Sequence, residues 1–372
     1  MMAAALSSSS NHHVRALPRR LIKRVGDIGQ CFIELSTKQT FGENCKALFL
    51  PGGGVKAVNS IKLGELNFDF TDPNPLIVSL SSPDMQVGVV SGIPFPITDA
   101  RQDVILVDKG VEIAKFSTPW VAAVMDGDTL KTTVGNTIVN VFDDKRDQFS
   151  AFISALAVNP TYTFILRGTV DVKLTISAPT PPKMPGMGGF GSFGGAADQL
   201  SKLAPSKSLT IAGIYFESEV TLSGFANFPD IEYVELLEKT INPDGSFVIK
   251  SKINIKNNSQ LGVKMGNVQF NTFDAASEDP IGVTVLEQLN LAHGDNFITA
   301  VSTSTAVAKN PAEIYKRVTE NGETFRFKGF AESSTNDPIL AKGISVVDIT
   351  VEIPALSNPA PAPAAPPAAP SA

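Results

Sequence analysis

Short stretches in which apolar and polar residues alternate recur through two long parts of the chain. In the first part they cover residues 66–70, 77–80, 85–87, 104–107, 137–142 and 163–166. In the second part they cover residues 209–211, 219–222, 246–255, 263–265, 268–270 and 298–301. A period of two residues is typical of strands with one buried face, and turn-forming residues separate the stretches. The pattern predicts an all-β protein with one β-sandwich in each part.

Each part also contains one segment with helical spacing, just before a late strand. In the first part an apolar stripe is formed by Phe149, Phe152, Ile153 and Leu156. In the second part the helix residues are Asn310 as the cap, Pro311 in the first turn, and Ile314 and Val318 on the inner face. Spacings of three and four residues place such side chains on one face of a helix. We therefore expect one short helix on the core of each sandwich.

Changes in composition divide the chain into five segments. These are a basic arm at residues 1–39, a first sandwich at 40–176, a Gly/Pro-rich linker at 177–208, a second sandwich at 209–354 and a Pro/Ala-rich tail at 355–372. Glycine frees the backbone and proline prevents regular pairing, so neither helix nor sheet is expected to continue through the linker. The arm and the tail are predicted to be disordered.

The two parts also match each other in sequence. One shift in numbering relates residues 153 and 163–168 to residues 314 and 324–329, and a larger shift relates 68–70 to 253–255. The difference between the two shifts falls in residues 120–147, where we expect an extra hairpin or long loop in the first part. A repeat of this length indicates a duplicated domain rather than a solenoid.

The basic arm permits several interpretations. Residues 15–24 contain five basic side chains, and the first acidic residue is Asp27. This composition is typical of a mitochondrial presequence, of a disordered basic arm, or of the cytoplasmic flank of a membrane segment. A secretory signal is not predicted, because no apolar stretch of suitable length follows the basic residues. No run of 18 apolar residues occurs in the sequence, so no transmembrane helix is predicted.

Charge and composition exclude several classes of protein. The formal net charge is −6, and a weakly acidic chain is a poor candidate for nucleic-acid binding, which requires a basic face. The two cysteines, Cys31 and Cys45, are too few for a disulfide scaffold or a four-cysteine zinc site. Of the three histidines two are adjacent, His12 and His13. We therefore predict no metal site and no cofactor.

A glycine motif in the linker has the spacing of a dinucleotide-binding fingerprint. It runs from Gly186 to Gly191 as Gly-Met-Gly-Gly-Phe-Gly. Such a loop must join a buried strand to a helix, so that the N-terminus of the helix faces the pyrophosphate. Prolines immediately before the motif break any such strand. The motif is therefore interpreted as part of the linker.

The remaining candidates for chemistry also have structural interpretations. Three acids precede the first predicted helix, Asp143, Asp144 and Asp147, where they complement its dipole. Asp126 and Asp128 flank a glycine in a hairpin turn and supply too few oxygens for a calcium site. His293 lies in a turn and has no nucleophile motif beside it. Trp120 is interpreted as a core or edge anchor. No catalytic residue is predicted.

One modification motif is present. Asn257-Asn-Ser259 is an N-glycosylation acceptor pattern, which makes Asn257 a candidate glycosylation site. Modification requires a lumenal or extracellular location. The same polar cluster is also a turn between two predicted strands, because asparagine and serine satisfy local backbone groups.

These turns and glycines carry a resemblance. The second part combines the strand 247–255, the Asn257 turn, residues 261–270, Pro280-Ile-Gly282 and the turn at residues 289–296. This arrangement resembles the late-embryogenesis type 2 (water-stress) domain, a fibronectin-III-like sandwich. Segments 58–66 and 164–168 of the first part also fit. Over residues 50–353 the chain resembles fungal proteins of the DUF3712 family.

The resemblance implies a fold more strongly than a function. Family members generally carry a basic arm, a membrane-spanning helix and a location at the vacuolar membrane, and this chain departs from them because its basic arm is followed by no long apolar run. We expect a non-enzymatic binding or scaffold protein, with a lipid or membrane surface as the candidate partner. The large number of phenylalanines, 23 against four tyrosines, is compatible with an apolar cleft or with two ordinary cores. The alternatives are an extracellular or wall-associated structural protein and, third, a hydrolase.

Overall fold

The computed structural model describes residues 58–89, 97–176, 207–228, 230–305, 308–334 and 337–356. All of them lie in one of the two units into which the chain divides, Lys56–Ala372. The predictions for the arm at 1–39, for the linker up to residue 206 with its glycine motif, and for the tail beyond residue 356 lie outside the described residues.

The first strand group is entirely antiparallel. It comprises β1 (Val58–Leu63), β2 (Leu66–Asp69), β3 (Ile77–Val89), β4 (Ile97–Asp108), β5 (Val111–Ser117), β6 (Val121–Asp126), β7 (Thr129–Val141), β8 (Thr161–Ile176) and β9 (Lys207–Ser223). The strands follow the spatial order β2-β3-β7-β5-β4-β8-β9, with β1 continuing β2 along β3 and with β6 beside β4 and β7. Between β7 and β8 lie a 3-10 turn, Asp143–Lys145, and the helix α3 (Arg146–Val158).

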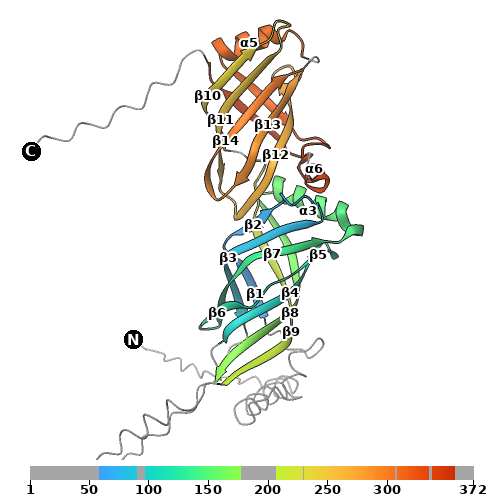
Figure 1. The fold of residues 1–372 in the computed structure, drawn as a ribbon, viewed down its shortest axis with the longest axis vertical. Helices are drawn as coiled ribbons and strands as arrows, with labels where there is room; N and C mark the ends of the chain where they lie inside the picture. Colours follow the sequence, from blue (N-terminus) through green and yellow to red (C-terminus); the bar gives the residue numbers. More distant parts are fainter. Residues whose placement is uncertain are drawn as a thin grey trace, which may run out of the picture. The chain divides into compact units, whose positions relative to one another are not determined.

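The second strand group repeats this order. It comprises β10 (Ile231–Ile241), β11 (Phe247–Asn257), β12 (Leu261–Asp274), β13 (Pro280–Leu291), β14 (Gly294–Ser304), α5 (Pro311–Glu320), β15 (Glu323–Lys328), α6 (Pro338–Ile344) and β16 (Asp348–Ile353). Its spatial order is β10-β11-β14-β13-β12-β15-β16, and Figure 1 shows β10, β11, β14, β13 and β12 in this succession. The two groups correspond when β1 and β2 are counted as one strand and β6 is left out. The third and fourth strands then form a hairpin in both groups, β4 with β5 and β12 with β13. The helix precedes the sixth strand, which is β8 or β15. β6 has no counterpart, and it lies in the region where the extra hairpin was expected.

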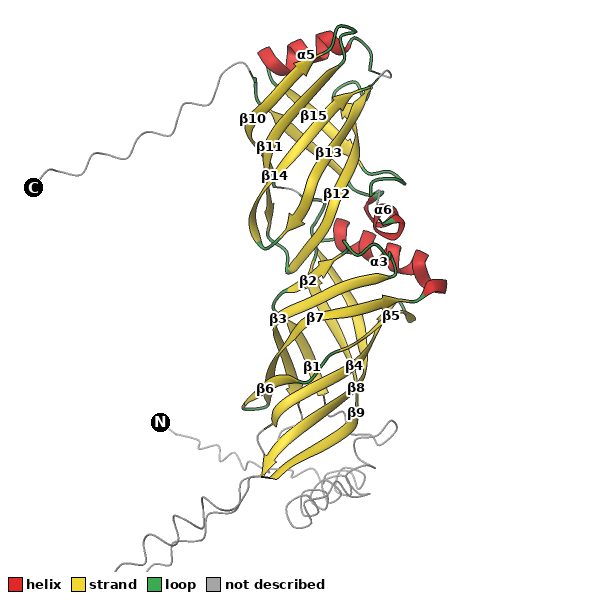
Figure 2. Ribbon diagram, viewed as in Figure 1, coloured by secondary structure: helices red, strands yellow, loops and turns green. Residues whose placement is uncertain are grey.

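The alternation read from the sequence corresponds to buried and exposed faces. Along β7, buried positions alternate with exposed ones over most of its length, and Val139 is almost fully buried. In each group the first strand contacts the last, β1 with β9 and β10 with β16, so that each sheet curls around an apolar core. The all-β class is confirmed, and strands dominate the fold (Figure 2).

Two features differ from the expected division into domains: the place where the second sandwich begins, and the expectation of two separate sandwiches. The second sandwich was expected to begin at residue 209, but β9 (Lys207–Ser223) pairs along its whole length with β8 of the first group. In addition, the two groups do not form separate sheets, because β2 pairs with β12 in parallel. A free strand edge exposes unpaired N–H and C=O groups, and this pairing satisfies those of β2. The matched segments 68–70 and 253–255 lie on β2 and β11, which hold different places in the strand order.

Both predicted helices are present, and the stripe from Phe149 to Leu156 is buried. The capping expected of Asn310 was wrong, because its side chain makes no capping hydrogen bond and its φ is 54°. The acids before α3 form ion pairs, Asp143 with Arg146, Asp144 with Lys145 at 2.7 Å and Asp147 with Lys342 at 2.6 Å. A third helix, α6, was not predicted.

Candidate functional site

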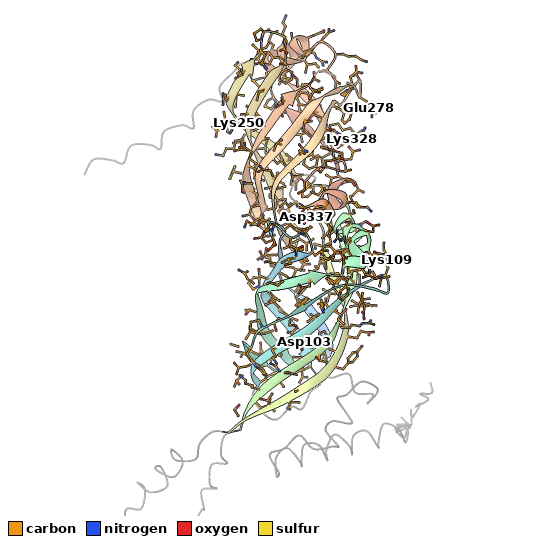
Figure 3. All side chains as sticks on the ribbon, turned by 45° about the vertical axis from the view of Figure 1, so that its right-hand side comes forward. Asp103, Lys109, Lys250, Glu278, Lys328 and Asp337 are labelled. Atoms are coloured by element: carbon orange, nitrogen blue, oxygen red, sulfur yellow. The ribbon has the colours of Figure 1, made fainter. Side chains whose placement is uncertain are left out.

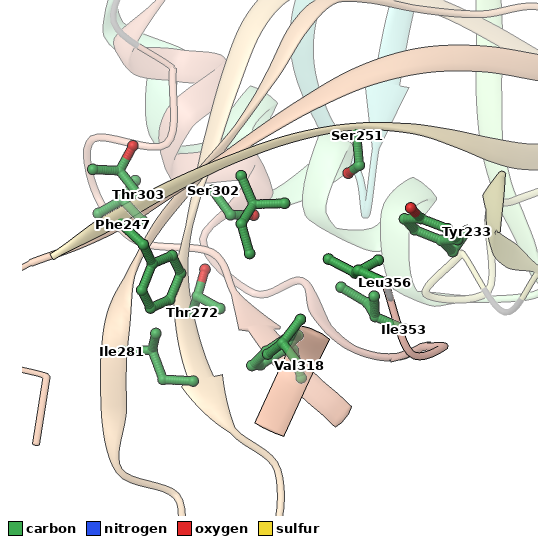
Figure 4. A pocket seen from close by; sticks show the side chains of 13 residues that line it. Tyr233, Phe247, Ser251, Thr272, Ile281, Ser302, Thr303, Val318, Ile353 and Leu356 are labelled. Atoms are coloured by element: carbon green, nitrogen blue, oxygen red, sulfur yellow. The ribbon is translucent and has the colours of Figure 1, made fainter. Parts of the chain in front are cut away.

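The interior of each strand group contains a small cavity. The cavity of the first group, about 20 Å³, lies among side chains that include Leu66, Met85 and Phe164. That of the second group, also about 20 Å³, is lined by residues such as Tyr233, Phe247 and Leu356 (Figure 4). A cavity of 10–15 Å³ or more accommodates one water molecule. These two cavities therefore have space for a water molecule rather than for a lipid chain.

The second interior has a polar wall as well as an apolar one. Thr272 and Thr284 share a hydrogen bond of 2.9 Å, and Thr284 and Ser302 share one of 2.8 Å. Thr272 and Ser302 also line the cavity, together with apolar side chains such as Val318 (Figure 4). Because these hydroxyls satisfy one another across three strands, the chain of hydrogen bonds stabilises the interior of the sheet.

Several polar contacts between residues far apart in the sequence lie at the junction between the strand groups. Its backbone links include Leu66 N–H to Gln260 C=O and Phe70 N–H to Lys264 C=O, both at 2.8 Å. The side chain of Gln260 donates to the carbonyl of Leu63 at 3.0 Å and accepts from the N–H of Ser223 at 3.0 Å. Gln260 thus joins the end of β1, the end of β9 and the start of β12.

Two helices pack against each other beside this strand pair. Ser150 and Ser154 of α3 donate to the carbonyls of Ile339 and Gly343 of α6, each at 2.9 Å. Gly343 permits this approach, because a Cβ there would lie 2.8 Å from Cγ2 of Ile153. Figure 1 shows α3 beside α6, whereas α5 lies at the opposite end of the second strand group. Ser154 also satisfies a carbonyl at the end of α6 that has no partner within the helix.

α6 begins at a buried carboxylate. Asp337 is 2% exposed, and it accepts hydrogen bonds from the N–H groups of Ile339 at 2.8 Å and Leu340 at 3.0 Å. Burial raises the pKa of Asp337 above its usual value, and the two N–H donors offset only part of this effect. Figure 3 labels Asp337 close to α6. Its position is that of a helix N-cap.

The chain passes between the groups through a tight, left-handed connection. Ala226, Asn227 and Phe228 have φ values of 49°, 62° and 52°. Gly224 comes so close to the end of α3 that a Cβ there would lie 2.2 Å from the carbonyl oxygen of Asn159. Left-handed backbone costs a non-glycine residue roughly 1–2 kcal/mol. Packing and hydrogen bonds around the connection must therefore offset this conformational cost.

Asn257, the candidate glycosylation site, lies in the turn that enters β12. It is 3% exposed, its side-chain nitrogen donates to the carbonyl of Leu261 at 2.7 Å, and its oxygen accepts from the N–H and hydroxyl of Ser259. A glycan on this nitrogen would need space that the folded turn does not have. The turn interpretation of the cluster agrees with this geometry.

The other candidates lie apart from the junction or on its surface. His293 is exposed in the turn between β13 and β14, with Nδ1 3.1 Å from the carbonyl oxygen of Ser259. Trp120 is half-buried. Lys173 Nζ lies 4.2 Å and Arg101 Cζ 5.0 Å from the centroid of its ring. Asp126 pairs with Lys131 across the β6–β7 turn. Within the described ranges, no group of three potential metal ligands occurs.

No helix among the residues that the structure describes has the length and apolar character needed to cross a membrane.

The comparison with protein families gives one match. Residues 202–272 match the model of DUF3712, a family of proteins of unknown function. The match supports the resemblance over this segment, which runs from β9 through the left-handed connection to β12. It therefore includes Gln260 and the strand that pairs with β2. No curated protein matches the chain.

Proposed function

We propose that the chain is a non-enzymatic scaffold that holds two similar strand groups in one fixed arrangement. The observation that carries the proposal is the parallel pairing of β2 with β12, reinforced by the packing of α3 on α6. Strand pairing and helix packing on the same junction restrict rotation about more than one axis. A flexible pair of binding modules would need neither.

The use of the ionisable groups supports a structural role. Arg317 pairs with Asp274 at 2.7 Å and with Glu323 at 3.2 Å, and the Asp274 carboxylate also caps the turn at Ala276 and Ser277. Burial raises the pKa of Asp274, but these hydrogen bonds outweigh burial and hold the pKa below its usual value. Each such contact joins one element to another, as a scaffold requires.

The size of the cavities favours a scaffold over a lipid carrier. An apolar ligand inside either strand group would have to widen a space of about 20 Å³. Ligand pockets usually measure about 300–1,000 Å³. A lipid bound to this interior would therefore require strands to separate.

The resemblance adds finer points to the proposal. We infer that the two strand groups arose by duplication of a domain like the late-embryogenesis type 2 domain, which the shared strand order supports. A fungal origin and a vacuolar-membrane location follow only from the resemblance. Imaging of the fluorescently tagged chain tests the location.

Distance measurements between spin labels test the scaffold. We would place labels at Val124 and Leu237, both exposed and in different groups, in a chain whose Cys31 and Cys45 are replaced by serine. A control pair at Val124 and Ile138 lies within the first group and gives the width due to the labels alone. We expect both pairs to give one narrow distance distribution. A broad or double distribution for the first pair alone would overturn the proposal.

The lipid alternative has its own measurement. Mass spectrometry of an organic extract of the purified chain should find no lipid at one molecule per chain. A lipid present at that ratio would favour a carrier.

A further inference from the structure

The outer face of the junction contains a groove of about 260 Å³. It lies where β2 and β12 pair, between β3 and β7 of the first group and β13 of the second. Two cross-strand rows follow from the register. One row runs from Ser81 through Asn67 to Gly262, and the next from Ser79 through Asp69 and Lys264 to Asn290. Neighbours in register on the same face of a sheet lie close together, so each row forms a continuous strip.

Gly262 leaves room for the side-chain amide of Asn67 over the strand pair. It faces Asn67 in the parallel pair, and a Cβ at this position would lie 1.8 Å from Oδ1 of Asn67. Any other residue would therefore displace the amide of Asn67. The glycine thus keeps this amide at the wall of the groove.

The walls of the groove carry several polar side chains. They are the amides of Asn67, Asn136 and Asn290 and the hydroxyls of Ser79 and Ser81. Within the part of the chain that the structure describes, none of these five side chains makes a hydrogen bond to another protein group. Each amide has donors and acceptors, and each hydroxyl has both in one atom. The groove thus presents mixed hydrogen-bonding capacity on both sides.

The charge in the groove is already balanced. Lys264 Nζ lies 2.9 Å from Oδ2 of Asp69, and Asp69 also accepts from the N–H and hydroxyl of Thr71. A charged ligand would have to compete with this ion pair. An apolar ligand would cover the amides and hydroxyls without giving them partners, which is costly. A neutral ligand with several adjacent hydroxyl groups satisfies all of these conditions.

We infer that this groove binds a neutral polyhydroxylated ligand, namely a sugar ring that is free or at the end of a glycan. Its volume of about 260 Å³ is far above the ~10–15 Å³ that one water molecule needs and is close to the lower end of the roughly 300–1,000 Å³ usual for ligand pockets. The inference goes beyond the scaffold and depends on it in one respect, because both strand groups supply walls. The groove exists only while the groups are docked.

Ligand-observed NMR on the full chain tests the inference. The probes are glucose, mannose, galactose and N-acetylglucosamine, and a glycan array separates free sugars from glycan ends. For a ligand of this size we expect saturable binding to at least one probe with a dissociation constant in the low millimolar range. No saturable binding to any sugar or glycan would overturn the inference.

Variants locate the binding. Asn136→Ala combined with Asn290→Ala removes two exposed amides and should weaken binding about tenfold, because each hydrogen bond makes a modest net contribution. Asn140→Ala is the matched control, since Asn140 is exposed on the same strand as Asn136 but outside the groove. Gly262→Ala should also weaken binding, because the added methyl group would displace the amide of Asn67 from the wall of the groove. Equal binding by the double variant and the control would overturn the assignment of the site.

The spin-label distances separate this inference from the proposed function. A narrow distribution of label distances without sugar binding would contradict the sugar site but not the proposed scaffold. A broad distribution rejects the scaffold, and sugar binding that persists in such a chain rejects the assignment of the groove.

Discussion

The two strand groups share one strand order but use their helices differently. α3 buries six residues, and it packs both on the core of the first group and on α6 of the second. α5 occupies the same place in the strand order, yet it buries only Ile314 and Val318 and is attached to the β12–β13 turn through Arg317. A helix at this place in the strand order can therefore serve the junction or only its own group.

The glycines show where the two groups have the same requirement. Gly168 on β8 and Gly329 after β15 both come so close to a neighbouring backbone that a Cβ would lie within 2.2 Å of a carbonyl oxygen, that of Asp103 and of Ile344 respectively. These residues match under the shift that also matches the helices, but Asp103 lies on β4 and Ile344 lies in α6. The two groups therefore share a close backbone approach at this position, although the element that approaches differs.

The largest difference between the groups should follow from truncation of the helix cores. Phe152 is fully buried, and its ring lies 5.4 Å from that of Phe164 in an edge-to-face arrangement. Phe152→Ala should lower the free energy of unfolding by about 3–5 kcal/mol, because it removes a large side chain and leaves a cavity. Ile314→Ala in α5 should lie near the lower end of the range of about 2–5 kcal/mol. Urea unfolding measures both, and an equal or larger loss for Ile314→Ala would contradict the comparison.

The next largest difference between the groups is expected in the free energy of unfolding lost when an ion pair is broken. Arg317→Met leaves the carboxylate of Asp274, whose side chain is 5% exposed, with only its backbone donors. We expect a loss of about 2 kcal/mol, below the 3–5 kcal/mol of a fully buried pair because the arginine is 40% exposed.

The matched variant of the first group is Arg167→Met, which breaks a pair with Glu112 in which both side chains are more than one third exposed. It should cost less than about 1 kcal/mol. Similar losses for the two arginine variants would show that burial of Asp274 has no effect on the pair.

These variants also differ in their dependence on pH. Because the pKa of Asp274 is held below its usual value, its contribution is complete above the unfolded-state pKa and is lost as pH falls through the folded-state pKa. The cost of Arg317→Met should therefore shrink as the solution is acidified. Unfolding at a series of pH values measures this, and a constant cost down to pH 2 would contradict it.

The junction itself can be loosened from the side of α6. Gly343→Val places a branched side chain against Ile153 and should cost about 1–2 kcal/mol by overpacking. Because the change acts on the α3–α6 contact, unfolding should separate into two transitions and the inter-group label distances should broaden. Gly135→Ala is the control, since nothing lies within 4 Å of the added Cβ. A single, unshifted transition for Gly343→Val would mean that the helix contact does not couple the groups.

Local patterns in the sequence were sufficient for many of the strands and for two helices, but the predicted stretches did not include β5, β10, β13 or β16. Alternation and helical spacing reflect which face of an element is buried, and both are properties of neighbouring residues. α6 was not predicted, because its seven residues are buried on most sides and no polar face reveals the helical period. Asp337 followed by Pro338 was the available signal, as a cap residue before a proline in the first turn.

The junction could not be predicted in this way. Leu66 pairs with Leu261, and neither segment contains anything that specifies the other. The groove depends on the same register, because Asn67 and Asn290 are ordinary exposed strand residues until β2 and β12 meet. Asn257 is a different case. Its glycosylation motif can be read from the local sequence, but the turn into β12 determines that its side chain is buried. Chemistry that arises from long-range pairing is visible only in the fold.

The smallest expected effect concerns two of the buried aspartates, Asp274 and Asp337, whose pKa values move in opposite directions. Asp337 has no cation beside it in the described structure, and burial raises its pKa despite its two backbone donors. A group with a raised folded-state pKa contributes its stability below the unfolded-state pKa and loses it as pH rises through the folded-state pKa. The charged form at neutral pH is therefore the less favourable one, in contrast to Asp274.

Asp337→Asn tests this sign, because asparagine caps a helix as well as aspartate but carries no charge. We expect the variant to be more stable than the natural chain at pH 7, by up to about 1 kcal/mol, and equal to it near pH 3. Asp337→Ala, which removes the cap as well, should cost about 1 kcal/mol near pH 3, where charge no longer matters. If Asp337→Asn were destabilising at pH 7, the carboxylate charge would be favourable to α6, and the two aspartates would act on the second strand group with the same sign.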